Sequence, residues 1–407
     1  MRISRRALLA GSCSALAPIS WTGGNGVAAA SGQDPRAFQD IFGAPSRGRI
    51  VLDARTYDLT EAIAWNLSDV VVRGVPGKTR LRTNHRTVLY FSRACRNVVF
   101  EDIIFETANA NSAEQSYFAT VLSDNFRLTN IKFIRCGFTA RHYRGDTAVF
   151  AGVNAFKLIA EARDAVIEQF HILEPVIDGY GAMGVEVQNH AGDGVQRYFD
   201  VQISGGLIRD TGLSGTHGQG VSLSGPGSDC KINSVFDNCR YAAIENVGAS
   251  NSVFSGRSRN LTRSCGPLMF TNTTPMADCV IEDFQCLDRA NGDVRLENMK
   301  GVRLQGNRLS LSGRVVIQDV EGLRASDEAY LVGALPGLLI QSTSGRVCKN
   351  NEWVRTVIEA TGTDRMQPLV QFFGSGTRQN RLIGPTLRGV GPLRSQNVNG
   401  AELNSLT

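Results

Sequence analysis

The chain has 407 residues and a formal net charge of +5. Three of the positive charges, Arg2, Arg5 and Arg6, fall in an N-terminal segment, and the remaining chain carries only +2. So small an excess argues against the strongly basic surface that binding to nucleic acid or to an anionic membrane requires.

The first thirty residues have the features of an export signal. Residues 4–9 (SRRALL) look like a twin-arginine motif, and a short, weakly apolar stretch follows them. Ala28–Ala30 offers a small-residue cleavage site. Glycine, serine and proline interrupt the apolar stretch, so it is too short to span a bilayer. We therefore expect a signal peptide over residues 1–30 and a periplasmic or secreted bacterial protein.

A capping segment and an opening strand are expected next. Residues 34–42 (DPRAFQDIF) predict a short helix within an N-terminal cap at residues 31–48. Such a helix would cover the first open turn of the structure that follows. Residues 49–59 (RIVLDARTYDL) predict the opening strand of that structure.

From Val70 onward the chain repeats one β-rich phrase with alternating apolar positions. Its copies begin at Val70, Val98, Phe126, Ala165, Val201, Cys230, Ser252, Cys279 and Val302. A repeated strand unit cannot bury its apolar face alone and must stack on its neighbours. The repeat therefore predicts an all-β solenoid, with an irregular β-sandwich as the weaker alternative.

A second set of strand phrases keeps step with the first, at residues 181–187, 218–223 and 242–247. Glu186, Ser222 and Glu245 occupy equivalent places in them, beside a residue that would point inward. We expect these three side chains to stack in one outward row. The simplest interpretation of the two glutamates is that they are solvated residues on an outer face.

The C-terminal part has a weaker pattern. After about Leu311 the repeat loosens, and we expect irregular final turns within a coil domain at residues 49–383. Residues 384–407 predict a tail. Eight cysteines follow the signal segment without zinc-like spacing, so we expect them to be mainly structural. Cys230 and Cys279 open strand phrases and would lie inside the coil.

The repeats resemble those of right-handed parallel β-helix proteins of the pectin-lyase-like superfamily. This resemblance implies a polysaccharide ligand, since the fold carries lyases, hydrolases, epimerases and phage tailspikes. Residues 217–223 (HGQGVSL) are similar to a phrase of polygalacturonase-like hydrolases. However, Gln219 stands where that family has its histidine, and Met183 stands where it needs an aspartate. That subfamily is therefore disfavoured, and no acidic cluster supports a calcium-dependent pectate lyase.

The two longest repeat intervals span residues 126–201 and point to the site. Extra length in a solenoid goes into loops, which wall a cleft. Four of the five histidines fall in or near this region, at positions 142, 171, 190 and 217. His171 lies within a strand phrase and is expected to be structural.

Two chemistries are open for this region. A lyase needs a base for the proton beside a uronate carboxylate and a cation to neutralise that carboxylate. The candidate bases are His217, His190 and Tyr143, and the candidate clamps are Arg209 and Arg144. A hydrolase instead uses two carboxylates. The candidates for that pair are Glu186, Asp193 and Glu245.

We therefore expect an exported enzyme that acts on a polysaccharide, with β-elimination of a uronate-containing polymer ahead of hydrolysis or epimerisation. A non-catalytic polysaccharide-binding or surface protein is the alternative from another class. The expected partner is a polysaccharide, with acidic polymers among the candidates, and no nucleic acid. No cofactor and no metal ion are expected.

Overall fold

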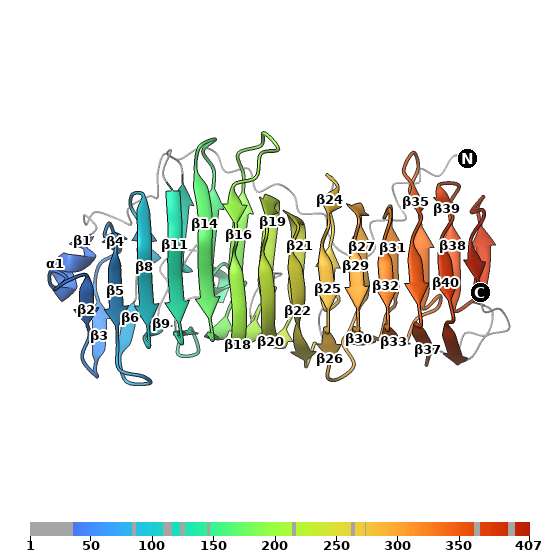
Figure 1. The fold of residues 1–407 in the computed structure, drawn as a ribbon. Coiled ribbons are helices and arrows are strands. Elements are labelled where there is room, and N and C mark those ends of the chain that lie inside the picture. The colour runs from blue at the N-terminus through green and yellow to red at the C-terminus, as the bar shows by residue number, and fades with distance from the viewer. Residues whose placement is uncertain are drawn as a thin grey trace, which may run out of the picture.

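The chain winds as a parallel β-helix, an elongated coil of stacked strands, in the computed structural model (Figure 1). The structure describes residues 36–83, 87–108, 116–122, 127–144, 147–213, 217–261, 265–272, 274–361, 367–389 and 395–407. The predicted fold class is confirmed. The predicted export signal at residues 1–30 lies outside the described residues. Within the described ranges no helix is long and apolar enough to cross a membrane.

Three faces enclose the coil, and each is a ladder of parallel strands. Face 1 contains β2 (Arg49–Val51), β5 (Val70–Arg73), β8 (Cys95–Glu101), β11 (Arg127–Ile134), β14 (Val166–Leu173), β25 (Val280–Glu282), β29 (Arg303–Gln305), β32 (Arg324–Ser326), β36 (Glu352–Val354), β40 (Arg381–Ile383) and β43 (Ser405–Leu406). Face 2 contains β3 (Thr56–Leu59), β6 (Arg80–Thr83), β9 (Ile104–Thr107), β12 (Gly137–Thr139), β15 (Val176–Tyr180), β26 (Gln285–Cys286), β30 (Arg308–Ser310), β33 (Ala329–Val332), β37 (Val357–Ala360) and β41 (Thr386–Gly389). Three long strands run through both faces: β18 (Gln202–Thr211), β20 (Lys231–Cys239) and β22 (Val253–Arg259).

Face 3 follows face 2 in each turn of the chain. It contains β1 (Arg36–Ala37), β4 (Ile63–Trp65), β7 (Thr87–Phe91), β10 (Ser116–Leu122), β13 (Asn154–Ala160), β16 (Val185–Asn189), β19 (Val221–Ser228), β21 (Ile244–Ser250), β23 (Leu268–Phe270), β27 (Val294–Glu297), β31 (Val315–Gln318), β34 (Leu338–Gln341), β38 (Val370–Phe373) and β42 (Ser395–Val398). The remaining elements are α1 (Phe38–Phe42), α2 (Thr147–Phe150), β17 (Tyr198–Phe199), β24 (Met276–Ala277), β28 (Met299–Lys300), β35 (Cys348–Lys349) and β39 (Thr377–Arg378).

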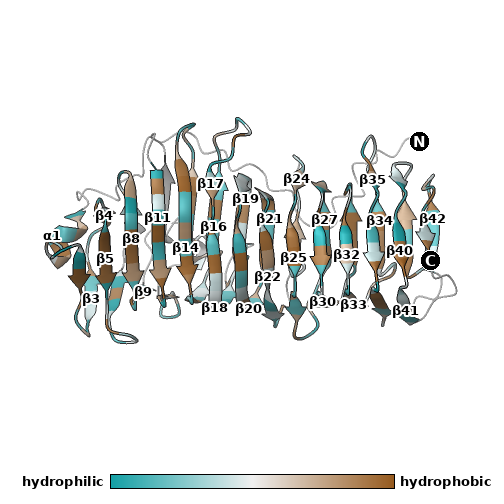
Figure 2. Cartoon of the chain, viewed as in Figure 1, coloured by the Kyte–Doolittle hydropathy of each residue, from teal (hydrophilic) through white to brown (hydrophobic). Residues whose placement is uncertain are grey.

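Alternate side chains of each strand fill the interior, because successive residues of a strand point to opposite sides. Figure 2 shows the resulting mixture of apolar and polar positions along the strands. The same interior position is repeated from coil to coil, so like side chains stack. Phe100 and Phe133 stack on face 1 with ring centroids 4.9 Å apart, and Phe105 and Phe138 on face 2 at 5.0 Å.

The predicted N-terminal cap is present as α1. Phe38 is fully buried, and its ring meets that of Trp65 edge to face at 4.6 Å. The helix therefore covers the apolar interior at the first coil. Its observed length is shorter than the predicted 34–42, and residues 34 and 35 lie outside the described residues.

Asparagine side chains tie neighbouring coils together at the bends. Asn130 Nδ2 donates to Asn97 Oδ1 at 2.9 Å, and Asn97 Nδ2 donates to Asp69 Oδ1 at 2.7 Å. All three residues have positive φ, which Asn and Asp tolerate better than other side chains. Stacked turns of one shape thus reinforce the register of the strands beside them.

The coil stays regular after Leu311, where we expected irregular turns. Strands β31, β34, β38 and β42 continue face 3 in unbroken register. Strand pairing also extends into residues 384–407, where β41, β42 and β43 pair with β37, β38 and β40. Inside these coils Asn351, Asn380 and Asn404 accept backbone N–H bonds from one coil to the next. Because this ladder consists of asparagines, it does not contribute to the apolar repeat, and the repeat is therefore weaker in the sequence after Leu311.

The eight cysteines that the structure describes are all free thiols. Cys230 and Cys279 are 1% and 0% exposed, as expected for small apolar residues inside the coil. Burial raises the pKa of the Cys230 thiol to about 12, so it stays protonated.

Candidate functional site

The predicted row of Glu186, Ser222 and Glu245 is present on face 3. Glu186 of β16 pairs with Ser222 of β19, which pairs with Glu245 of β21. Val185 and Val187 on either side of Glu186 belong to the interior core, so the glutamate points to the outer side. The row continues in the other direction to Lys157 of β13. Two strand spacings of about 4.8 Å separate the two glutamates along the backbone.

Both glutamates are buried although they lie on an outer face. Glu186 is 6% exposed and Glu245 is 7% exposed, so the interpretation of them as solvated surface residues is wrong. Burial raises the pKa of each carboxyl group, because removal from water disfavours the charged form. Each carboxyl group therefore holds its proton to a higher pH than an exposed glutamate.

Amide side chains hold Glu186 through both of its oxygens. Asn154 Nδ2 donates to Glu186 Oε2 at 2.9 Å, and Gln188 Nε2 donates to Oε1. Asn154 is itself fixed, because its Oδ1 accepts the backbone N–H of Met183 at 2.8 Å. Such donated hydrogen bonds favour the ionised carboxylate and oppose the effect of burial.

Glu245 is held at only one of its oxygens. Ser222 Oγ donates to Glu245 Oε2 at 2.7 Å, and Gln219 Nε2 donates to the same oxygen at 2.9 Å. Gln219 Oε1 accepts the backbone N–H of Gly218 at 2.9 Å. Within the described part of the chain, Glu245 Oε1 has no hydrogen-bond donor, and this oxygen is available to carry a proton toward a ligand.

Two basic side chains act on this pair. His217 lies in the turn between β18 and β19, and a positive charge on its ring lowers the pKa of both Glu186 and Glu245. Lys157 also lowers the pKa of Glu186. The Lys157 ammonium forms no hydrogen bond or ion pair with any residue that the structure describes. We call Lys157, Glu186, His217, Ser222 and Glu245 the glutamate cluster.

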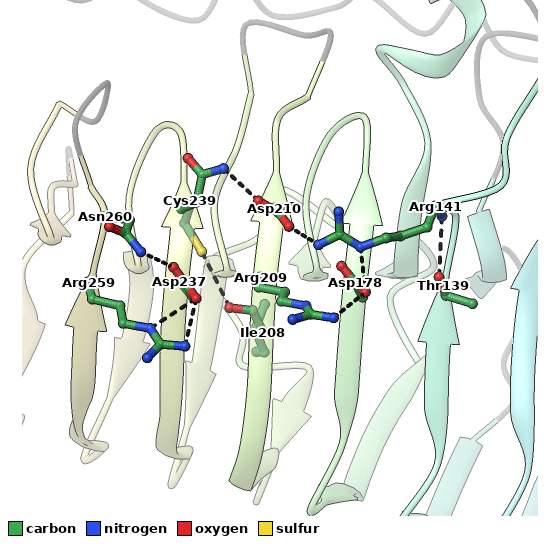
Figure 3. A network of polar contacts seen from close by, with 11 residues as sticks. Thr139, Arg141, Asp178, Ile208, Arg209, Asp210, Asp237, Cys239, Arg259 and Asn260 are labelled. Atoms are coloured by element: carbon green, nitrogen blue, oxygen red, sulfur yellow. Dashed lines mark hydrogen bonds and ion pairs between the residues drawn. The ribbon is translucent and has the colours of Figure 1, made fainter. Parts of the chain in front are cut away.

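Arg209 does not belong to this cluster. It lies on the outer side of face 2, in a ladder of alternating charge formed by Asp178, Arg209, Asp237 and Arg259 (Figure 3). Its Nη2 lies 2.9 Å from Asp178 Oδ2, an oxygen that also contacts Arg141 Nε at 2.7 Å. Arg209 and His217 are close in sequence. Arg209 lies in strand β18 of face 2, whereas His217 lies in the turn from that strand to face 3.

Tyr143 and Arg144 follow β12 and lie in the segment before α2. The Tyr143 ring stacks on Phe150 with centroids 4.4 Å apart. The Arg144 side chain is exposed, and its Nη1 donates to the Tyr143 carbonyl oxygen at 3.0 Å. No contact among the described residues joins either of them to Glu186 or Glu245.

His190 and Asp193 lie beyond the other end of β16, in the turn from face 3 to face 1. The His190 residue is exposed, and partial desolvation of its ring lowers its pKa. Asp193 Oδ2 accepts from Arg197 Nη2 at 2.5 Å, and its Oδ1 accepts the Val195 N–H at 3.1 Å. Asp193 therefore stabilises its own turn, and its carboxylate is not paired with either glutamate. His171 Nε2, on face 1, lies 3.2 Å from Asp200 Oδ2.

Lys157, Asn154 and Gln219 belong to the site although the strand pattern did not indicate them. Lys157 could have been found by aligning the strand at residues 154–160 with the strand that contains Glu186. Gln219 stood out only as a departure from a hydrolase motif. Among the described residues, no group of three acidic, histidine or cysteine side chains is arranged to hold a metal ion.

Comparison with known proteins identifies no family for this chain. No protein-family model matches the chain, and no curated protein matches it in sequence. Among solved structures, it is similar to the A-module of a mannuronan C-5 epimerase from Azotobacter vinelandii, with 15% identity over 88% of this chain and 91% of that one, at a TM-score of 0.43. A mannuronic acid specific family 6 polysaccharide lyase from human gut microbiota has 12% identity, with 86% of each chain covered, at 0.45. A surface adhesin of Streptococcus pneumoniae has 11% identity over 88% and 92%, at 0.41. At these values the likeness concerns the coil alone.

Proposed function

We propose that this protein cleaves glycosidic bonds of a polysaccharide by acid–base catalysis, with Glu245 as the general acid and Glu186 as the general base. The observation that supports this most is the pair of buried carboxyl groups, in register on one outer face and both with raised pKa. A general acid must be protonated near neutral pH, and burial favours that state.

The hydrogen bonds distinguish the two roles. Glu186 accepts amide N–H bonds at both oxygens and has the Lys157 ammonium nearby, which together favour its ionised form. Glu245 receives both of its bonds at Oε2, so Oε1 can hold the proton that the leaving oxygen takes up. In this scheme Glu186 removes a proton from water while Glu245 protonates the departing sugar oxygen.

The strand spacing of the pair lies slightly beyond the carboxyl separation that inverting hydrolysis uses. Carboxyl groups of inverting glycosidases lie roughly 6.5–9.5 Å apart, which leaves room for the attacking water. The backbones of Glu186 and Glu245 are about 10 Å apart across one intervening strand. The intervening residue is Ser222, whose hydroxyl donates to Glu245 Oε2.

Elimination is the second candidate, favoured by one observation. The unpaired Lys157 ammonium could neutralise a uronate carboxylate, and His217 could take the adjacent proton. The substrate would then be an acidic polysaccharide. Arg209 and Arg144, the clamps expected from sequence, do not support this route, because Arg209 is engaged by Asp178 and Arg144 lies apart from the cluster.

The test is incubation with a panel of acidic and neutral polysaccharides while reducing ends and the ultraviolet absorbance of unsaturated uronates are both followed. We expect new reducing ends without that absorbance. Glu245→Gln and Glu186→Gln should each slow cleavage at least about 100-fold, which is the usual worth of a general acid or base. Glu168→Gln, on β14 of face 1, is the matched control and should keep its activity.

Three outcomes contradict hydrolysis by this pair. Rising absorbance that only His217→Ala and Lys157→Ala abolish would establish elimination instead. Unchanged rates in both glutamate variants would place the chemistry elsewhere. Binding of polymers without any cleavage would support a non-catalytic surface protein.

We also propose that residues 1–30 direct export to the periplasm or the medium. The support is the SRRALL motif followed by a small-residue site at Ala28–Ala30. Terminal sequencing of the exported protein should give a first residue at or near Ser31. Retention of Arg5 and Arg6 in that protein would exclude cleavage at this site.

A further inference from the structure

A groove lies at the corner where face 1 bends into face 2, on the side of the coil opposite the glutamate cluster. It has a volume of about 570 Å³ and follows β18, β20, β22 and the β25–β26 bend. Because the three faces enclose the interior, a corner between faces 1 and 2 is remote from the outer side of face 3. The groove is therefore separate from the proposed catalytic site.

The floor of this groove is bare backbone. Gly206 has φ of +66°, and a Cβ there would lie 2.0 Å from the Pro175 carbonyl oxygen. Gly256 has φ of +130°, and its Cβ would meet the Ser234 carbonyl oxygen at 2.4 Å. Ser234 is buried and donates its hydroxyl to the Gly205 carbonyl oxygen at 2.8 Å. Side chains are thus excluded from the floor for reasons of backbone geometry.

The two walls carry polar side chains that face the groove from different directions. Asn233 and Ser255 are register partners on the face 1 side, and Glu282 follows on the next strand. Arg257 and Gln285 are register partners on the face 2 side. Acceptors and donors therefore meet across the groove.

The charged groups of these walls have no partners within the described structure. The side chains of Arg257, Glu282 and Asp283 form no hydrogen bond or ion pair with any described residue, although they line one groove. On the same strand as Arg257, Arg259 is paired with Asp237 at 2.9 Å. Arg259 is thus paired, whereas the Arg257 side chain, two residues before it, is open to a ligand.

We propose that this groove binds a neutral saccharide segment, as a second carbohydrate site distinct from the glutamate cluster. Sugar hydroxyls donate to carboxylates such as Glu282 and accept from Arg257 and the Asn233 and Gln285 amides. The single cation is outnumbered by Glu282 and Asp283, so an anionic polymer fits less well. Val235 offers a small apolar contact for the C–H side of a ring.

The probes are neutral hexasaccharides of β-1,4-linked glucose, xylose and mannose, titrated into the full chain by calorimetry. At least one should bind, and Arg257→Ala and Glu282→Ala should each weaken it about 10-fold or more. Arg259→Ala is the matched control on the same strand, outside the groove, and should bind normally. Glu245→Gln should also bind normally, which separates this site from the proposed catalytic one.

Hydrogen exchange with and without the bound hexasaccharide locates the site independently of the variants. Protection is expected in β20 and β22 and not in β16 or β21. The proposal is overturned if no neutral hexasaccharide binds at millimolar concentration, if both groove variants bind as the unaltered chain does, or if protection falls on face 3. Failure of the hydrolysis test would leave this result unaffected.

Discussion

Each glutamate of the cluster accepts a hydrogen bond from an amide side chain whose orientation is fixed by a bond to the backbone. These amides are Asn154 for Glu186 and Gln219 for Glu245. The Met183 N–H binds Asn154 Oδ1, and the Gly218 N–H binds Gln219 Oε1. Each amide must therefore present its N–H group, and not its oxygen, to the carboxyl group beside it. Both amides favour the ionised form of their glutamate, which limits how far burial can raise its pKa.

Removing these amides should move the two limbs of the pH–rate profile separately. Gln219→Leu removes a donor to Glu245 and raises the pKa of the general acid. Because the acid works while it is protonated, the alkaline limb should move to higher pH, by about one unit. Asn154→Leu raises the pKa of the general base, which works while ionised, so the acidic limb should move upward. The measurement is kcat/KM against pH.

These limbs report the coupled pair and not isolated groups. The direction of each shift still identifies which glutamate serves as acid. Exchange of the two effects, with Gln219→Leu moving the acidic limb, would reverse the assigned roles. A loss of activity at all pH values, without movement of either limb, would mean that the amides only support the fold.

At the scale of the strands, the charge ladder of face 2 holds three coils together. Asp178 is 7% exposed and accepts from both Arg141 and Arg209. Asp178→Asn would leave the Arg209 guanidinium without its carboxylate and leave Arg141 with Asp210 alone, and we expect a loss of about 2 kcal/mol in the free energy of unfolding. The exposed pair of Asp327 and Arg355 is the control, since Asp327→Asn should cause no measurable loss. Urea denaturation measures both, and equal losses would show that burial of Asp178 is irrelevant.

The strand pattern predicted the coil and the row of Glu186, Ser222 and Glu245, because both depend on positions that recur in step. It did not predict that the glutamates are buried, since Asn154, Gln219 and Ser222, which contact them, come from neighbouring coils. It also grouped Arg209 with His217 by their nearness in sequence. Arg209 lies in strand β18 and His217 lies in the turn after that strand. Side chains eight positions apart in a solenoid can therefore lie on different faces without contact.

At the scale of the whole molecule, one acidic side chain buried in the continuous interior should make the stability of the fold depend on pH. Glu328 is 1% exposed, and its Oε1 accepts from Asn307 Nδ2 at 3.1 Å while Oε2 accepts from the Tyr330 hydroxyl at 3.0 Å. Burial raises the pKa of Glu328 from 4.5 to about 7. The folded chain therefore binds this proton more tightly than the unfolded chain does.

The free energy of unfolding should consequently fall as pH rises from 4.5 to 7. Below that range both states hold the proton, and within it only the unfolded state loses it. The total loss corresponds to about 3 kcal/mol. Glu328→Gln resembles the protonated side chain at every pH, so it should remove this loss and be more stable than the unaltered protein above pH 7. Near pH 4 the two should be equally stable.

Urea unfolding at pH 4, 6 and 8 tests this, with Glu359→Gln as the control because Glu359 lies on the next coil of the same face with its side chain 46% exposed. The control should follow the unaltered protein at all three pH values. If Glu328→Gln does so too, Glu328 is ionised in the folded state without cost, and its hydrogen bonds from Asn307 and Tyr330 outweigh its burial. If Glu328→Gln is instead less stable at every pH, the amide disrupts the contact with Tyr330. Only a gain confined to the higher pH values supports a proton held inside the coil.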